Sequence, residues 1–141
     1  MNRGDYLRFV AYFILLYAVL RFTLGYLLQH PTATIVAAMV GCPVNGNAIV
    51  CGYNEYEIVP ECTGIVSIVL LLSLLLVLPI DRSHKIRAAV FGSLFLYILN
   101  LFRIYALIGL SESLFAFDLL HLLFWFASPV IVILYVTWLM K

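Results

Sequence analysis

The chain has 141 residues, of which 65% are hydrophobic and only 11% are charged. A soluble domain is usually about 45–50% apolar and about 25% charged, and one domain of this length could not hide so much apolar surface from water. The composition excludes an ordinary soluble fold and indicates a single integral membrane domain over residues 1–141. A net charge of +1 excludes a broad basic surface, so we expect no nucleic-acid partner.

Four apolar stretches are long enough to cross a bilayer, which takes about 20 residues each. The spans are expected at residues 6–28, 63–80, 86–110 and 118–140. The first has an apolar core too long for a cleavable signal peptide, so we expect it to be retained. The predicted fold class is therefore an all-α membrane protein with four transmembrane helices.

Basic residues are distributed unevenly around the predicted spans. Six of them lie before the first span, between the second and the third, or at the C-terminus: Arg3, Arg8, Arg82, Lys85, Arg87 and Lys141. The other two connections, residues 29–61 and 111–117, contain no Lys or Arg. By the positive-inside rule we expect a multi-pass protein of the cell membrane, with both termini cytoplasmic and these two connections on the extracytoplasmic side.

The two remaining basic residues, Arg21 and Arg103, fall inside predicted spans. Each lies about seven residues before the outer end of its span, which is about 10 Å deep at 1.5 Å per residue. A charge at this depth usually faces the interior of a helix bundle or a wet cavity. A long side chain can also reach back to the headgroups, and for Arg21 both possibilities stay open.

The outer connection, residues 29–61, differs from the spans on either side. Residues 32–40 form an apolar run that is too short to cross, which predicts a short interfacial or re-entrant helix. Residues 48–51 and 56–59 flank a Gly-Tyr-Asn-Glu connection, which predicts a small hairpin. Because open strand edges are not tolerated in hydrocarbon, we expect the hairpin in or above the headgroups.

Three cysteines lie on the predicted outer side. A Cys42–Cys51 disulfide would tie down the outer loop and leave Cys62 as the odd thiol. Three unpaired, inert cysteines are the alternative. Cys62 lies at the mouth of the second span, where the positive end of the helix dipole is expected to lower its pKa and favour the thiolate. Thr63 is predicted to cap that helix.

Polar residues of the third and fourth spans are expected to converge on the outer leaflet. Asn100 and Arg103 are three residues apart on one helix face, as are Asp118 and His121. We expect Cys62, Arg103 and His121 to approach one another. This set suits acyl transfer, with a thiol nucleophile, an imidazole acid–base, and an arginine that stabilises the oxyanion or the thiolate.

Four further residues are predicted to support this site: Arg21, Thr63, Asn100 and Asp118. Asp118 would either orient the imidazole of His121 or cap its own helix, and capping is the simpler role. The outer-side ligands match no metal-site spacing, so we expect no metal and no other cofactor.

At these residues the sequence resembles the archaeosortase and exosortase family of membrane cysteine transpeptidases. The matching motifs are Glu61-Cys62-Thr63-Gly64-Ile65, Asn100-Leu101-Phe102-Arg103-Ile104 and the histidine of Asp118-Leu119-Leu120-His121. The resemblance implies that Cys62, Arg103 and His121 are catalytic. It also implies a substrate, the C-terminal sorting tail of a surface protein, which is cleaved at a short motif so that the new C-terminus passes to a lipid-type acceptor.

Two other functions stay open at this point. Quinone-coupled thiol–disulfide oxidoreductases with four helices also have outer cysteines and a membrane arginine. They exchange electrons through Cys-x-x-Cys pairs, and this sequence has none. A non-catalytic, lipid-binding membrane subunit would use Arg21 and Arg103 to bind an anionic headgroup.

Overall fold

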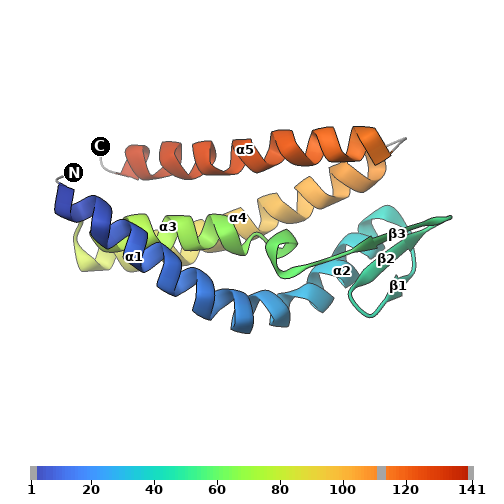
Figure 1. Ribbon diagram of the computed structural model, residues 1–141, viewed down its shortest axis with the longest axis horizontal. Helices are drawn as coiled ribbons and strands as arrows, with labels where there is room; N and C mark the ends of the chain where they lie inside the picture. Colours follow the sequence, from blue (N-terminus) through green and yellow to red (C-terminus); the bar gives the residue numbers. More distant parts are fainter. Residues whose placement is uncertain (1–2, 111–113, 140–141) are drawn as a thin grey trace.

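The computed structural model describes residues 3–110 and 114–139 and is mostly helical (Figure 1). Its elements follow in the order α1 (Arg3–Leu20), π-helix η1 (Arg21–Gly25), α2 (Tyr26–Val40), β1 (Val44–Asn45), β2 (Ala48–Cys51), β3 (Asn54–Glu57), 3-10 helix η2 (Pro60–Thr63), α3 (Ile65–Val77), α4 (Arg82–Leu110) and α5 (Leu114–Leu139). Within the described residues, three helices are long and apolar enough to cross a membrane: Arg3–Val40, Arg82–Gly109 and His121–Trp138. Large hydrophobic side chains are exposed along all three, as lipid-facing surfaces require, and the chain is a membrane protein.

The first helix is much longer than the predicted span at residues 6–28. α1, η1 and α2 follow one another without a break. The 38 residues of this helix extend about 57 Å, beyond the hydrocarbon core of about 30 Å. Residues 32–40 therefore form the end of this long helix, and the structure shows no separate re-entrant helix over that described stretch.

The long helix continues because α2 has a face to bury. Thr32, Ala33 and Val36 are fully buried, whereas α1 has no buried residue. Tertiary packing of such a face supplies most of the stability of a helix, so α2 persists through Pro31. It ends at Gly41, whose φ of 74° is the left-handed conformation that favours glycine at a helix C-terminus.

A small antiparallel sheet follows α2, with the strand order β1-β2-β3. The predicted hairpin is confirmed, with Ala48–Cys51 as its first strand and Asn54–Glu57 as its second. The second strand begins at Asn54 and not at Tyr56, because Gly52, with a φ of 62°, allows a tighter turn than predicted.

The sheet is fastened to the helices on one side. Ile49 of β2 is fully buried and packs in one core with Val36 of α2 and Ile104 of α4. A disulfide joins Cys42, just after α2, to Cys51 at the end of β2. These contacts hold the sheet against one end of the helix bundle.

The predicted second span, residues 63–80, is shorter in the structure. η2 leads through Gly64 into α3, whose 13 residues extend about 20 Å, less than the hydrocarbon core of about 30 Å. α3 ends where Leu78 becomes extended before Pro79, a conformation that a following proline favours. The expected count of four spanning helices is therefore not confirmed: the described residues form three, with α3 as a shorter apolar helix packed against α1, α4 and α5.

The ends of the elements gather in two groups (Figure 1). The start of α1, the end of α5 and the turn between α3 and α4 lie at one end of the molecule. The sheet and the beginning of α5 lie at the opposite end. This arrangement agrees with the predicted grouping of the basic residues on one side of the membrane. The assignment of that side to the cytoplasm stays a prediction.

Candidate active site

Cys62 lies in the short turn η2, between the sheet and α3. Pro60 begins the turn, and Gly64 ends it with a φ of 82°. The hydroxyl of Thr63 donates a hydrogen bond of 2.6 Å to the carbonyl oxygen of Pro60, within the turn itself. The prediction that Thr63 caps the following helix is wrong, because Gly64 occupies the N-cap position of α3.

α4 holds this turn from one side. The amide Nδ2 of the buried Asn100 donates a hydrogen bond of 2.5 Å to the carbonyl oxygen of Cys62. A Cβ atom at Gly64 would lie 3.1 Å from the Cβ of Asn100, so both the space and the positive φ require glycine there. The backbone from the carbonyl of Cys62 to Gly64 is therefore held against α4.

Cys62, Arg103 and His121 line one cavity of about 380 Å³. Cys62 comes from η2, Arg103 from α4 and His121 from α5. Residues 53–58 of the sheet form another wall of the cavity, which therefore lies at the sheet end of the molecule. The three residues that the sequence singled out thus share one cavity, although the first and the last are 59 positions apart in the sequence.

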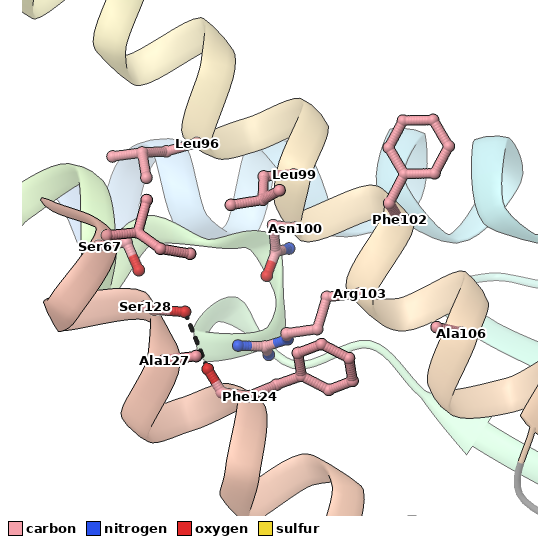
Figure 2. Close-up of a pocket in the computed structure, with 11 residues that line it drawn as sticks. Ser67, Leu96, Leu99, Asn100, Phe102, Arg103, Ala106, Phe124, Ala127 and Ser128 are labelled. Carbon is pink, nitrogen blue, oxygen red and sulfur yellow. Dashed lines mark hydrogen bonds between the residues drawn. The ribbon is translucent and has the colours of Figure 1, made fainter. Parts of the chain in front are cut away.

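Arg103 lies where three cavities meet. Besides the cavity that contains Cys62, it lines an apolar cavity of about 330 Å³ between α4 and α5 (Figure 2) and a third of about 240 Å³ beside Glu61. Its side chain points from α4 toward α5 in Figure 2. Among the residues that the structure describes, the buried Nε of Arg103 has no hydrogen-bond partner. This N–H can donate to a bound molecule.

The environment of Cys62 disfavours the thiolate. Burial raises the pKa of the thiol above its ordinary value, and the charge of Glu61 adds to the rise. The charge of Arg103 acts in the opposite direction, so the guanidinium is close enough to stabilise a thiolate, but burial dominates. The predicted lowering of the thiol pKa is wrong, because burial of Cys62 raises this pKa by more than the lowering influences offset.

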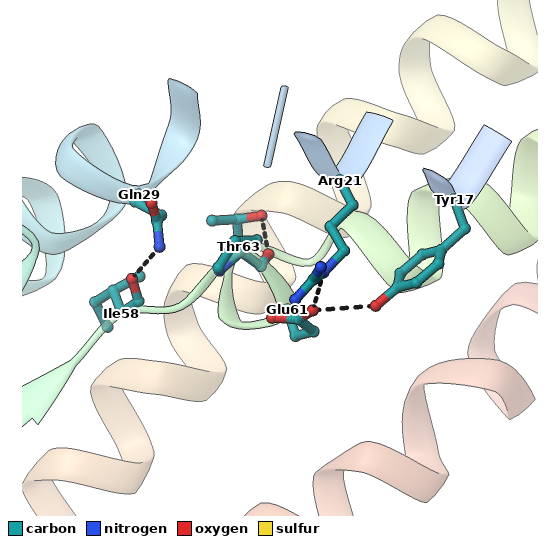
Figure 3. Close-up of polar contacts among 7 residues, drawn as sticks. Tyr17, Arg21, Gln29, Ile58, Glu61 and Thr63 are labelled. Carbon is teal, nitrogen blue, oxygen red and sulfur yellow. Dashed lines mark hydrogen bonds and ion pairs between the residues drawn. The ribbon is translucent and has the colours of Figure 1, made fainter. Parts of the chain in front are cut away.

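Glu61, the residue before the thiol, is bound to the first helix (Figure 3). Arg21 forms an ion pair with its carboxylate, and the hydroxyl of Tyr17 donates a hydrogen bond of 3.1 Å to the same oxygen. Burial alone would raise the pKa of Glu61, but these hydrogen bonds outweigh it and hold the pKa below its ordinary value. Arg21 therefore faces the turn that carries Cys62. It lies near the middle of the long helix, not seven residues from its end.

Two contacts of the first helix were absent from the sequence predictions. Tyr17 binds Glu61, and the amide Nε2 of Gln29 donates a hydrogen bond of 2.9 Å to the carbonyl oxygen of Ile58. The signal in the sequence is spacing: Tyr17, Arg21 and Gln29 recur at multiples of four in a mostly apolar stretch. Such spacing brings side chains to one helix face.

The other predicted residues have different outcomes. Cys42 and Cys51 are bridged to each other, and Cys62 is the cysteine that carries a free thiol. The prediction that Asp118 caps its helix is wrong, because α5 begins at Leu114 and Asp118 lies inside it. Its side chain lies outside the described part of the chain, so its orienting role stays a prediction. Over residues 3–110 and 114–139, no group of three or more His, Cys, Asp or Glu could hold a metal ion.

The fold and the site define a helical membrane protein with a cysteine, an arginine and a histidine around one cavity at the end of its bundle. Residues 4–139 match the protein family described as Transmembrane exosortase (Exosortase_EpsH). The chain therefore belongs to the transmembrane exosortase family, in agreement with the resemblance of its three motifs. Comparisons with curated proteins and with solved structures found no match.

Proposed function

We propose that this protein is a membrane cysteine transpeptidase that cleaves the C-terminal sorting tails of surface proteins. Membership of the exosortase family supports this class of activity. The observation that carries the proposal is the single cavity lined by Cys62, Arg103 and His121. It combines a nucleophile, a proton carrier and a cationic hydrogen-bond donor in one small volume.

In the first step, the sulfur of Cys62 attacks the carbonyl carbon of the scissile peptide bond. Because burial raises the pKa of this thiol, the thiol carries its proton near neutral pH and needs a base. His121 takes the proton as the carbon–sulfur bond forms, and gives it to the departing amine as the carbon–nitrogen bond breaks. The products are a thioester at Cys62 and a released tail with a new amino terminus.

Arg103 would stabilise the negative charge that forms on the carbonyl oxygen between these two events. Its buried Nε, which has no hydrogen-bond partner among the described residues, supports this role. A donor in a site that excludes water stabilises an oxyanion far more than the same donor in bulk water.

In the second step, a hydroxyl or amine of a lipid-type acceptor attacks the thioester carbon. The acceptor's proton returns through His121 to the sulfur of Cys62 as the carbon–sulfur bond breaks, which joins the surface protein to the acceptor and restores the thiol. Water in place of the acceptor gives hydrolysis. The apolar cavity between α4 and α5 supports a lipid acceptor, because it meets the site at Arg103 and has room for part of an acyl chain.

We place this site at the extracytoplasmic face of the cell membrane. The predicted distribution of basic residues supports this side, because it assigns the termini to the cytoplasm. The Cys42–Cys51 disulfide supports it independently, because it lies at the same end as the cavity and disulfides persist in oxidising compartments.

The proposal is tested by co-expression with a surface protein from the same source that ends in a short motif, an apolar helix and a basic cluster. Epitope tags before and after this tail report its removal. Cys62→Ala, Arg103→Ala and His121→Ala are each expected to accumulate the uncleaved precursor while the variant protein inserts into the membrane. Normal maturation with Cys62→Ala would contradict the proposal.

A double variant, Cys42→Ser with Cys51→Ser, is the matched control. It removes two cysteines without touching the reacting thiol, so processing is expected to continue. A thiol–disulfide oxidoreductase would instead need the bridged pair as well as Cys62, and the double variant would then be inactive. The control therefore separates the two activities.

A further inference from the structure

A row of inward-facing residues on the first helix lies against the segment that leads into Cys62 (Figure 3). We call it the positioning row, and its members are Tyr17, Arg21, Gly25 and Gln29. They are spaced four residues apart. Each is less exposed than the two residues that follow it along the helix, and Gly25 is buried.

Tyr17 and Arg21, the N-terminal half of this row, bind Glu61, the residue next to the nucleophile. Arg21 pairs with the carboxylate of Glu61, and Tyr17 donates a hydrogen bond to the same carboxylate oxygen. Both partners of the ion pair are about one-third exposed, at 33% for Arg21 and 34% for Glu61. Removing either partner would leave a charge that is mostly shielded from water and without its counter-ion.

Gly25 and Gln29, the C-terminal half of the row, contact the chain just before Glu61. A Cβ atom at Gly25 would lie 3.1 Å from the Cβ of Pro60, so a larger residue would push the start of η2 away. Gln29 donates a hydrogen bond to the carbonyl oxygen of Ile58. The row therefore contacts three of the four residues that precede Cys62.

The π-helix η1 explains why four residues spaced by four stay on the same side of the first helix. In an α-helix of 3.6 residues per turn, residues spaced by four drift around the axis by about 40° at each step. η1 covers Arg21–Gly25, the centre of the row, and its wider turn holds more residues. That turn offsets the drift and keeps Tyr17 and Gln29 on the same side of the helix. Single π-turns inside α-helices are frequent at functional sites.

We propose that the positioning row sets the place of the Cys62 sulfur in the catalytic cavity, so that Tyr17, Arg21, Gly25 and Gln29 are positioning residues for the transpeptidase reaction. The inference rests on the proposed function for its activity readout. Asn100 fixes the carbonyl of Cys62 from α4, and the row fixes the preceding residues from the first helix. The nucleophile is thus held between two spanning helices.

Two variants of the row test this inference, each with a matched control. Arg21→Gln removes the ion pair, and Arg8→Gln removes a basic residue from the same helix away from the turn. Gly25→Ala introduces the contact with Pro60, whereas Gly109→Ala adds a Cβ that meets nothing within 4 Å. Membrane insertion and the midpoint of thermal unfolding in detergent are measured for all four variants.

Two readouts are then compared. In the tail-cleavage assay, Arg21→Gln and Gly25→Ala are expected to lower kcat by about 10- to 100-fold, the effect of misplacing a reacting group, with KM unchanged because the row does not line the substrate cavity. In the second readout, a water-soluble maleimide alkylates Cys62 over a range of pH. Both row variants are expected to shift the alkylation midpoint to lower pH, because a loosened turn admits water and burial is the main cause of the raised pKa of the thiol.

Wild-type alkylation profiles and wild-type kcat in both row variants would overturn the inference. An effect of equal size in Arg8→Gln or Gly109→Ala would also overturn it. If the wild-type protein cleaves no tail, the proposed function fails, and the alkylation profiles still decide whether the row positions the thiol.

Discussion

The side-chain amide of Asn100 donates a hydrogen bond to the backbone carbonyl of Cys62. This bond joins α4, which carries Arg103, to the turn that carries the thiol. The relative position of the Cys62 thiol and the Arg103 guanidinium therefore depends in part on this buried amide. Because the bond is to the main chain, its loss would displace Cys62 without changing the thiol chemically.

Asn100→Asp is expected to lower tail cleavage by about 10- to 100-fold. The substitution keeps the shape of the side chain but removes the donor, and it places a carboxylate against the carbonyl of Cys62. The initial rate of tail removal measures the effect. Asn45→Asp, on the exposed strand β1, is the matched control and should cleave at the wild-type rate.

Arg103→Ala is expected to lower tail cleavage by about 100- to 1000-fold, the usual effect of removing an oxyanion donor. The charge of Arg103 lowers the pKa of Cys62, so its removal should raise that pKa further and move the pH profile of maleimide alkylation to higher pH. Arg103→Lys keeps the charge and should restore most of the alkylation profile. An unchanged profile in Arg103→Ala would show that the two groups do not interact.

Glu61→Gln is expected to move the same profile in the opposite direction. The negative charge of Glu61 raises the pKa of Cys62, so its removal favours the thiolate and makes alkylation faster at a fixed pH near neutrality. Tail cleavage should nevertheless fall, because the ion pair with Arg21 is lost. Faster alkylation together with faster cleavage would contradict this account of Glu61.

Gly64→Ala is expected to destabilise the protein by more than the about 1 to 2 kcal/mol that a left-handed residue other than glycine costs. The additional cost arises because its Cβ would lie 3.1 Å from the Cβ of Asn100. Gly41→Ala separates the two effects, since Gly41 has a φ of 74° but nothing within 4 Å of the added Cβ. Unfolding in mixed micelles should show the larger loss for Gly64→Ala.

The meeting of Cys62, Arg103 and His121 in one cavity could be predicted from the sequence. Arg103 and His121 are polar residues in apolar spans, where a polar group usually faces the bundle interior. The constant rise of a helix then places each of them at a depth that can be counted from the end of its span.

Features that depend on long-range packing could not be predicted in this way. The pairing of Arg21 with Glu61 joins residues that are 40 positions apart, and no local sequence pattern predicts such a contact. The long first helix persists through Pro31 because its second half packs on the sheet and on α4. The pKa of Cys62 is raised by burial in η2. The sequence predicts only that Cys62 lies near the start of a helix, and this position does not indicate how deeply the thiol is buried.

The most direct test of the central claim uses purified protein in lipid nanodiscs with a tagged, tail-bearing surface protein. Mass spectrometry of the products identifies the new C-terminus and any lipid joined to it. Wild-type protein is predicted to release the tail at a single position, and Cys62→Ala is predicted to leave the substrate intact in equally folded nanodiscs. Tail release by Cys62→Ala at the wild-type rate would contradict the role of Cys62 as the nucleophile.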